Sequence, residues 1–426
     1  MTDVSTDTHT HAADNARAAS DPDAVAVAPD AGAEQPAPDP KELVRQRVAR
    51  AHEALIGLSH WIQANPELNF QETLATGWLV EWLEKAGFKV ERNVAGLDTA
   101  FIGRYGPGPL KVALVAEYDA LPEVGHACGH NIISACAIGA GIALAAVADQ
   151  LGMQVSVVGT PAEEGGGGKI VMVDQGIFNE FHCALMIHPG PSDLVLPEVL
   201  AAQTLEVTYT GRSAHAGAFP ERGINAADAI VVAQVAIGLL RQSLTGGDRV
   251  HGIVTSGGEA SNIIPARVTA EWMVRAPTVA RLDDLREKVK RCFEAGALAS
   301  GAELSFVERP PYADMRHDAA LAEVYAKNLQ ALGRKLTGRP GDPKRLDMNR
   351  FSTDMGNVSY VTPSIHPILG IASAPAVNHQ PEFTEATISA AADRAIYDGA
   401  VALAWTAIDA AQDAELRVRL LERREV

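Results

Sequence analysis

Cysteine, basic side chains and long apolar runs are all scarce in this chain. Only four of its 426 residues are cysteines, and they lack the spacing of a disulfide scaffold, so we expect a reducing, cytoplasmic compartment. The 36 lysines and arginines are outnumbered by 53 acidic residues, and the net charge of −17 argues against nucleic acid or an anionic membrane as a partner. The richest apolar stretch, residues 132–147, is too short to span a bilayer.

The first forty residues differ in composition from the rest of the chain. They are rich in Ala, Asp, Pro and Thr and contain eight acidic residues against one arginine, a net charge of −7. Such a segment cannot bury enough apolar surface to fold, so we expect residues 1–40 to form a disordered acidic tail. The remainder is long enough for two domains, since 47% of the whole chain is hydrophobic.

Short apolar runs alternate with segments of helical spacing after the tail. Residues 111–116, 154–159 and 183–187 are apolar runs of strand length, and a Gly- and Ala-rich helical segment at 131–150 separates the first two. Continuous apolar strands that alternate with helices are typical of a mostly parallel sheet covered on both faces. The sequence therefore predicts an α/β domain.

The pattern changes near residue 202. Residues 203–210 alternate between apolar and polar with period two, and two helical segments and further alternating strands follow up to residue 308. This order predicts a compact α+β module at about 202–311. It would be inserted into the α/β domain, which then comprises residues 41–201 and 312–426.

Side chains that can bind a metal ion follow the predicted strands. Asp119 comes after 111–116, the Glu163–Glu164 pair after 154–159, and His188 after 183–187; Cys128 and His130 lie in Gly-His-Ala-Cys-Gly-His, residues 125–130. Because sites in parallel sheets form at the carboxyl ends of the strands, we expect these groups to converge. Thiolate, imidazole and carboxylate suit Zn, and also admit Mn, Co or Fe. Adjacent side chains point in different directions, so one glutamate can bind metal while the other acts as general base.

Taken together, these motifs resemble the co-catalytic metallopeptidase family of aminoacylase and carboxypeptidase G, in particular its branch of the aminobenzoyl-glutamate hydrolases and the indoleacetyl-amino-acid hydrolases. The likeness covers everything after the tail. It implies a metallohydrolase domain with a mostly parallel sheet and an inserted α+β lid and dimerisation domain. The matching motifs follow one another at residues 117–122, 125–131, 161–169, 188–189, 211–216, 262–265, 352–359 and 378–383.

The resemblance implies a metal-binding role for five residues. Cys128 would bridge two metals, with His130 and His188 completing the first site and Glu164 and His379 the second. One or two divalent transition metals per subunit, Zn or Mn, are therefore expected.

Further roles follow from the same resemblance. Glu163 would be the general base, and Asp119 would orient a metal ligand. On the inserted module, His215 would contact a reacting oxygen, commonly in the neighbouring subunit's site, and residues 202–311 would form a homodimer. Asn262 and Arg275 are candidate substrate-binding residues.

Two arginines are additional candidates to hold a substrate carboxylate. Arg212 lies within the Gly-Arg-Ser-Ala-His-Ala motif, and Arg350 lies just before the Ser-Thr-Asp motif. The sequence also departs from the family twice. Asn131 stands where many relatives in this branch carry Asp, and Glu117 stands where the usual His-x-Asp motif has its histidine.

The chemistry and the resemblance together predict hydrolysis of a C–N bond in a small carboxylated substrate, by a metal-activated water with Glu163 as general base. The usual bond in the family that the chain resembles is an amide, so an amide is expected, as in N-acyl amino acids, dipeptides or aminobenzoyl-glutamate. An alternative with the same requirements is hydrolytic deamination of an activated aromatic amine such as a nitro-anthranilate. A non-catalytic binding protein on the same fold is a third hypothesis, which the intact Glu163 disfavours.

Overall fold

The computed structural model describes residues 38–337 and 350–422, without the side chain of Arg350. Within them the chain divides into two compact units. The first comprises residues 38–198, 316–337 with 350, and 357–422, and the second comprises Val199–Met315 and Phe351–Gly356. The acidic tail expected at 1–40 lies, up to residue 37, outside the described residues.

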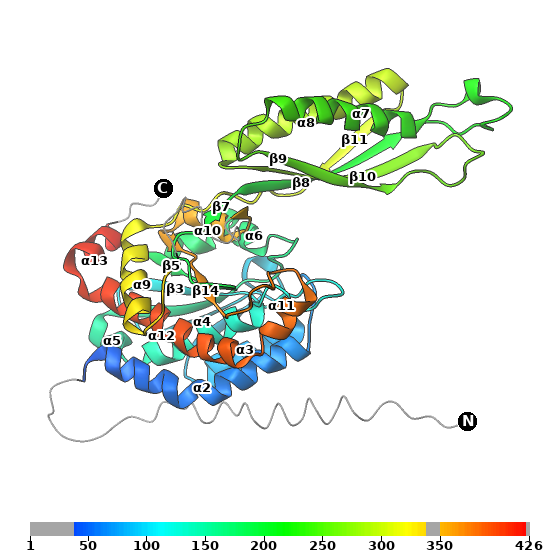
Figure 1. Cartoon of the computed structure of the whole chain (residues 1–426). Coiled ribbons are helices and arrows are strands. Elements are labelled where there is room, and N and C mark those ends of the chain that lie inside the picture. The colour runs from blue at the N-terminus through cyan, green and yellow to red at the C-terminus, as the bar shows by residue number, and fades with distance from the viewer. Residues whose placement is uncertain (1–37, 338–349, 423–426) are drawn as a thin grey trace, which may run out of the picture. The chain divides into compact units, whose positions relative to one another are not determined.

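A six-stranded sheet forms the centre of the first unit (Figure 1). The strands β4, β3, β5 and β13 are parallel to one another, whereas β2 is antiparallel to both of its neighbours, β4 and β1. The predicted mostly parallel α/β sheet is therefore confirmed. In spatial order the strands are β1 (Lys89–Arg92), β2 (Phe101–Tyr105), β4 (Met153–Gly159), β3 (Leu110–Ala116), β5 (Cys183–Leu185) and β13 (Ser364–Ile365).

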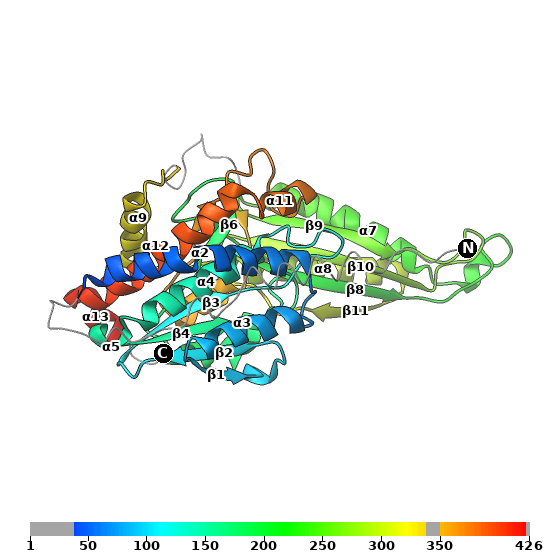
Figure 2. The same cartoon turned by 90° about the horizontal axis from the view of Figure 1, so that it is seen from below.

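Three helices pack together on one side of this sheet, α2 (Pro40–Ala64), α4 (His130–Ala145) and α12 (Ala390–Gln412) (Figure 2). All sixteen residues of α4 are buried, because it lies directly on β3 and β4 and is covered by the other two helices. Small side chains in α4 allow this close packing. The site described below begins at the N-terminus of α4.

Shorter elements complete the first unit. The helix α3 (Thr73–Lys85) packs on β1 and β2. The other elements are α5 (Ala148–Leu151), α6 (Gly168–Asp174), β6 (His188–Gly190), β7 (Glu198–Val199), α9 (Ala319–Ala331), β12 (Arg350–Phe351), α10 (Met355–Val361), β14 (Ile368–Gly370), α11 (Pro381–Ala386) and α13 (Ala414–Leu421). Of these, β7, β12 and α10 lie where the chain passes from one unit to the other.

The second unit is an antiparallel four-stranded sheet with two helices on one face (Figure 1). The strands lie in the order β11 (Glu303–Glu308), β8 (Ala201–Thr210), β10 (Arg267–Ala276) and β9 (Arg249–Ser256), and the helices are α7 (Ala226–Leu240) and α8 (Val279–Ser300). Leu205 and Val207 on β8 contribute to a core shared with Trp272 and Phe293. The period-two pattern of residues 203–210 reflects this one-sided burial.

The outer face of α7 is apolar and exposed. Val231, Val235 and Leu239 recur every four residues and are 56%, 59% and 71% exposed. By length and composition alone, Ala226–Ser243 could cross a membrane. The opposite face of α7, which includes Ala229 and Ala233, is buried in the core of the second unit.

Candidate metal centre

Three groups of metal-binding side chains meet at the carboxyl ends of β3, β4 and β5 in the first unit. In each group, the ligand atoms lie within 4.8 Å of one another. The groups are Cys128, His130 and His188; Cys128, Glu164 and His379; and Glu117, His130 and Glu163. The chain thus brings together six residues that the sequence predicted for this site, and adds Glu117.

Cys128 lies at the centre of the first two groups. Its Sγ is 3.4 Å from His188 Nε2 and 3.6 Å from His379 Nε2. The next residue, Gly129, has φ +84, and a Cβ there would meet the Pro189 Cγ at 2.4 Å. A glycine is therefore required between Cys128 and His130, because the backbone approaches the His188 strand closely.

Carbonyl and carboxylate acceptors fix the orientation of the buried imidazoles. His130 Nδ1 lies 2.8 Å from the Asp119 carbonyl and 2.9 Å from its Oδ1, and His188 Nδ1 lies 2.8 Å from the Pro189 carbonyl. In both rings Nδ1 therefore donates, and Nε2 faces the cluster. Asp119 lies where the sequence predicted an orienting carboxylate.

Three buried side-chain atoms of this cluster make no hydrogen bond in the part of the chain that the structure describes. Among the described residues, His130 Nε2, Glu117 Oε2 and Glu164 Oε1 have no hydrogen-bond partner. Leaving a buried polar atom unpaired costs roughly 1–3 kcal/mol, and more for a charged group. The His130 Nε2 atom lies 3.5 Å from Glu117 Oε2 and 3.8 Å from Glu164 Oε1, so cations bound between these atoms would satisfy all three.

Burial determines the protonation of the thiol and of His188. Burial, and next the Glu164 carboxylate, raise the pKa of the Cys128 thiol well above its usual value. The protonated thiol is a poor nucleophile, and a bound cation would stabilise its thiolate form instead. Burial and the neighbouring His130 lower the pKa of His188 to about 3, so its imidazole stays neutral and able to bind metal.

Glu163 and Glu164 lie on the turn that follows β4, and both approach His130. Glu163 Oε2 is 3.9 Å and Glu164 Oε1 is 3.8 Å from His130 Nε2, and Glu164 Oε2 is also 3.5 Å from His379 Nε2. The backbone N–H of Glu164 donates to Asp119 Oδ2 at 2.9 Å. Glu164 therefore reaches both imidazoles, and Glu163 shares one of them.

The candidates on the inserted module belong to the second unit. His215 is exposed, and its Nδ1 accepts hydrogen bonds from the Gly217 and Ala218 N–H groups at 3.2 and 3.1 Å. This fixes the neutral tautomer with the proton on Nε2, a donor ready for an oxygen acceptor. Asn262 lies beside it, since its carbonyl accepts the N–H of Ala216 at 2.9 Å.

The three candidate arginines differ in their surroundings. Arg275 on β10 is half-buried, burial lowers its pKa, and among the described residues its only hydrogen-bond partner is the Met273 sulfur at 3.2 Å. Arg212 is exposed and donates to the Arg222 carbonyl. The Arg350 side chain lies outside the described residues.

An ion pair beside the cluster was not predicted. Lys169 on α6 pairs with Glu117 Oε1, and both side chains are fully buried. The sequence contained a signal for this pair, namely a lysine that follows four glycines inside a matched motif. The pair leaves Glu117 Oε2 facing His130 Nε2 at 3.5 Å.

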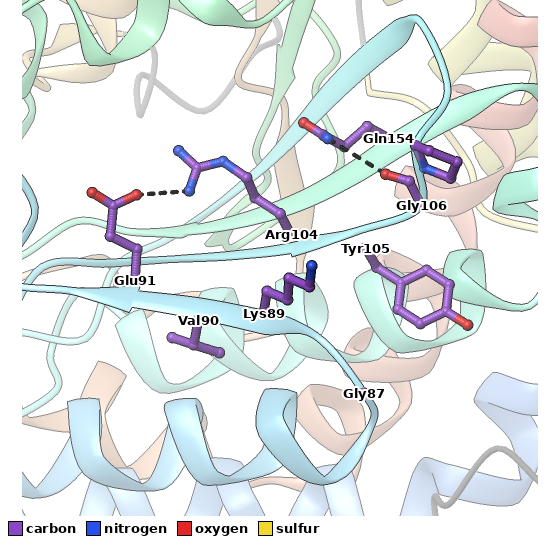
Figure 3. Close-up of a pocket in the computed structure, with 9 residues that line it drawn as sticks. Gly87, Lys89, Val90, Glu91, Arg104, Tyr105, Gly106 and Gln154 are labelled. Atoms are coloured by element: carbon purple, nitrogen blue, oxygen red, sulfur yellow. Dashed lines mark hydrogen bonds and ion pairs between the residues drawn. The ribbon is translucent and has the colours of Figure 1, made fainter.

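A pocket of about 630 Å³ lies elsewhere in the first unit (Figure 3). It is lined by residues of β1 and β2 and by Gln154 at the start of β4, the opposite end of that strand from Glu163. Arg104 in it is neutralised by Glu91 and Glu180. None of the metal-binding side chains lines this pocket, so it is separate from the candidate metal centre.

This chain is similar in sequence and in fold to known proteins. The sequence pattern of Peptidase family M20/M25/M40 matches residues 113–396. Xaa-Arg dipeptidase of Mus musculus is 38% identical over 386 residues, 87% of this chain and 88% of that protein. One of the p-aminobenzoyl-glutamate hydrolase subunits of Escherichia coli (strain K12) is 33% identical over 255 residues, 55% of this chain and 53% of that protein.

Solved structures agree in fold. A dinuclear metal binding peptidase from the M20 family of Bacillus subtilis superimposes with a TM-score of 0.60 at 22% identity, over 83% of this chain and 97% of that one. At this identity the likeness concerns the fold alone. With the family match over most of the chain and the cluster of metal-binding side chains, the conclusion is that this chain belongs to peptidase family M20/M25/M40 and is a metal-dependent hydrolase of C–N bonds.

Proposed function

We propose that this chain hydrolyses an amide bond of a small carboxylated substrate, of the dipeptide, N-acyl amino acid or aminobenzoyl-glutamate type, with Glu163 as general base. One observation carries the proposal. Two adjacent carboxylates that follow β4 both reach His130, and Glu164 also groups with Cys128 and His379, whereas Glu163 groups with His130 and Glu117.

The donor set fits a divalent transition metal. Its nitrogen, sulfur and oxygen atoms form groups within 4.8 Å of one another, and some of them are buried without hydrogen bonds among the described residues. We assign Cys128, His130, His188, Glu164 and His379 as ligands of one or two ions, Zn or Mn. A bound ion would lower the pKa of water and polarise the substrate carbonyl.

The residues of the chain account for the proton transfers. Glu163 accepts a proton from the water whose oxygen forms the new bond to the carbonyl carbon. It then gives this proton to the amide nitrogen as the C–N bond breaks, releasing an amine and a carboxylic acid. His215, through its Nε2–H, donates a hydrogen bond to the carbonyl oxygen as negative charge develops there.

The substrate carboxylate requires a cation, and Arg275 is the best-supported candidate. Its half-buried guanidinium has no carboxylate within ion-pair distance in the described part of the chain, so it can accept an anionic group. Arg212, Asn262 and Arg350 remain further candidates. The 38% identity to an Xaa-Arg dipeptidase over 87% of the chain makes dipeptides with a C-terminal arginine the first substrates to test.

The decisive test compares two neighbouring substitutions. Glu163→Gln should retain metal but lose roughly 10²–10⁴-fold in kcat, since general base catalysis contributes about that much. Glu164→Gln, the matched control, should lose metal as well as activity. Unchanged turnover by Glu163→Gln with metal retained would refute the mechanism. Product analysis completes the test: ammonia without a second organic fragment would favour ring deamination over amide hydrolysis.

We also propose a cytoplasmic homodimer that forms through residues 202–311 and binds neither nucleic acid nor membrane. The exposed apolar residues of α7 and the free edge of β9, where Ile253 is 65% exposed, support a second copy as the partner. The scarcity of cysteine and the net charge of −17 support the location and the excluded partners.

A further inference from the structure

The turn that carries Glu163 and Glu164 contains a strained backbone position. Ala162, directly before them, has φ +60 and a fully buried side chain. A residue with a Cβ costs roughly 1–2 kcal/mol in this left-handed region, and surrounding contacts must hold it there. The Ala162 carbonyl accepts hydrogen bonds from the Gly166 and Gly167 N–H groups, which fixes the side of the turn that follows.

The preceding side of the same turn is held by a carboxylate from a distant segment. The Ala162 N–H donates to Glu72 Oε1 at 2.9 Å across 90 residues of sequence. Glu72 Oε1 also accepts the Phe70 N–H at 2.9 Å, and Glu72 Oε2 accepts the Thr99 hydroxyl at 2.8 Å. The residue is fully buried, so solvent cannot take over any of these hydrogen bonds.

A helix-capping role does not explain this glutamate. Glu72 occupies the N-cap position of α3, yet its side chain makes no capping hydrogen bond. The N–H groups of Leu74 and Ala75 are satisfied by Glu67 instead. Its carboxylate therefore turns away from its own helix and toward the end of β4.

Three anchors fix the segment between β4 and the glycine run. The Thr160 N–H donates to the Ala116 carbonyl, the Ala162 N–H to Glu72, and the Glu164 N–H to Asp119. The hydrogen bond from Ala162 to Glu72 is the one at the strained residue. If it is lost, Ala162 can relax to a negative φ, which rotates the following peptide and displaces the Glu163 carboxylate.

We infer that Glu72 is a positioning residue for the reaction, because its buried carboxylate holds Ala162 in the conformation that aims Glu163 at the scissile bond. The inference rests on the proposed role of Glu163 as general base. It assigns Glu72 no contact with substrate or metal. Its effect should therefore appear in kcat and leave KM and metal content unchanged.

The test compares four variants at Glu72 and Thr99, assayed on dipeptides with a C-terminal arginine, with metal content measured on the same samples. Glu72→Leu and Glu72→Asp should lower kcat by roughly 10–100-fold, the order expected when a reacting group is misplaced by about 1 Å. Glu72→Gln keeps an oxygen for the Ala162 and Phe70 N–H groups and should stay within about threefold of the unchanged protein, the conservative rescue that positioning predicts. Thr99→Val, the matched control, removes a hydrogen bond from the same carboxylate but leaves Ala162 held, and should keep its kcat.

A second substitution tests the strain directly. Glycine adopts a positive φ without steric cost, so Ala162→Gly in the Glu72→Leu background should recover part of the lost kcat. If Glu72→Leu does not fold, Glu72→Asp carries the comparison, because it keeps the charge and only withdraws the oxygens from the Ala162 N–H.

Three results would overturn the inference: unchanged kcat in Glu72→Asp and Glu72→Leu, an equal loss in Thr99→Val, or a loss of activity that follows a loss of metal. Failure of the proposed function looks different. In that case Glu163→Gln itself remains active, whatever the Glu72 variants do.

Discussion

The ion pair between Lys169 and Glu117 gives the sharpest stability prediction. Both side chains are 0% exposed, so water does not screen the charge that remains when one partner is removed. Breaking a buried pair in this way costs about 3–5 kcal/mol. We expect Lys169→Met to destabilise the first unit by that amount, which corresponds to a fall in Tm of roughly 6–20 °C at about 2–4 °C per kcal/mol.

Two comparison variants separate this effect from a general effect of losing lysine. Lys327→Met breaks the pair with Glu323, whose side chains are 70% and 69% exposed, and should cost less than about 1 kcal/mol. Adding Glu117→Gln to Lys169→Met removes the stranded charge and should recover a large part of the loss. The assay is urea and thermal unfolding of the metal-depleted protein. A loss below about 1 kcal/mol for Lys169→Met, or one equal to that of Lys327→Met, would refute the reasoning.

Three other predictions concern the metal, pH and assembly. Cys128→Ser should lower metal affinity by more than the roughly 10–100-fold that outer-shell changes cost, as measured by metal titration, and activity should fall with it; full metal content would contradict a bridging role. Burial raises the pKa of Glu72 from its ordinary value of 4.5 to about 7, so the ionised carboxylate destabilises the fold; this penalty is absent below about pH 4.5 and complete above about pH 7. Relative to the unchanged protein, the free energy of unfolding of Glu72→Gln should therefore rise by on the order of 3 kcal/mol from about pH 4.5 to about pH 7. A difference that does not change with pH would contradict this prediction. Val235→Glu combined with Leu239→Glu should give a monomer by light scattering, while Val418→Glu, at an exposed position on α13, should not. An unchanged mass of the double variant would exclude α7 from the interface.

Much of the site could be predicted because strand ends are encoded locally. The apolar runs at 111–116 and 154–159 coincide with β3 and β4, and the polar groups that follow them meet at one edge of the sheet. The parallel topology places these polar groups close together, since it brings the carboxyl ends of neighbouring strands to one edge of the sheet. The convergence of Cys128, Glu164 and His188 needed no knowledge of long-range contacts beyond the strand pattern.

The antiparallel edge of the sheet could not be predicted in the same way. β1 consists of Lys89, Val90, Glu91 and Arg92, and none of these residues is buried. Such a strand has no hydrophobic alternation, and it exists because its backbone pairs with β2. The sequence also predicted one helix for 131–150, where the structure has α4 and the separate α5.

Asn131 and Glu117, the two residues expected to depart from the family pattern, make contacts that the sequence did not indicate. Asn131 does not face the cluster, because its side-chain amide donates to Ser59 on α2 at 2.8 Å, inside a packed helix pair. Glu117 does face the cluster, but it presents one oxygen to His130 and gives the other to Lys169. The side chain of Asn131 is therefore held by helix packing, and that of Glu117 by a charge partner.

Metal ligands are easier to predict from the sequence than the contacts that position them. A ligand must carry a particular atom at a strand end, so its residue type and its place in the pattern both indicate it. Glu72 only needs to offer an acceptor to one N–H, and nothing in the helix it precedes indicates that its side chain points elsewhere. The strain at Ala162 is likewise invisible in a sequence where glycine would be the expected residue, although four glycines follow Glu164 directly. An alanine at this position restricts the backbone of the unfolded chain more than glycine would. A hydrogen bond to a carboxylate from another segment offsets the cost of its positive φ. On the inference made above, the position of Glu163 depends on a hydrogen bond between two residues that are 90 positions apart in the sequence.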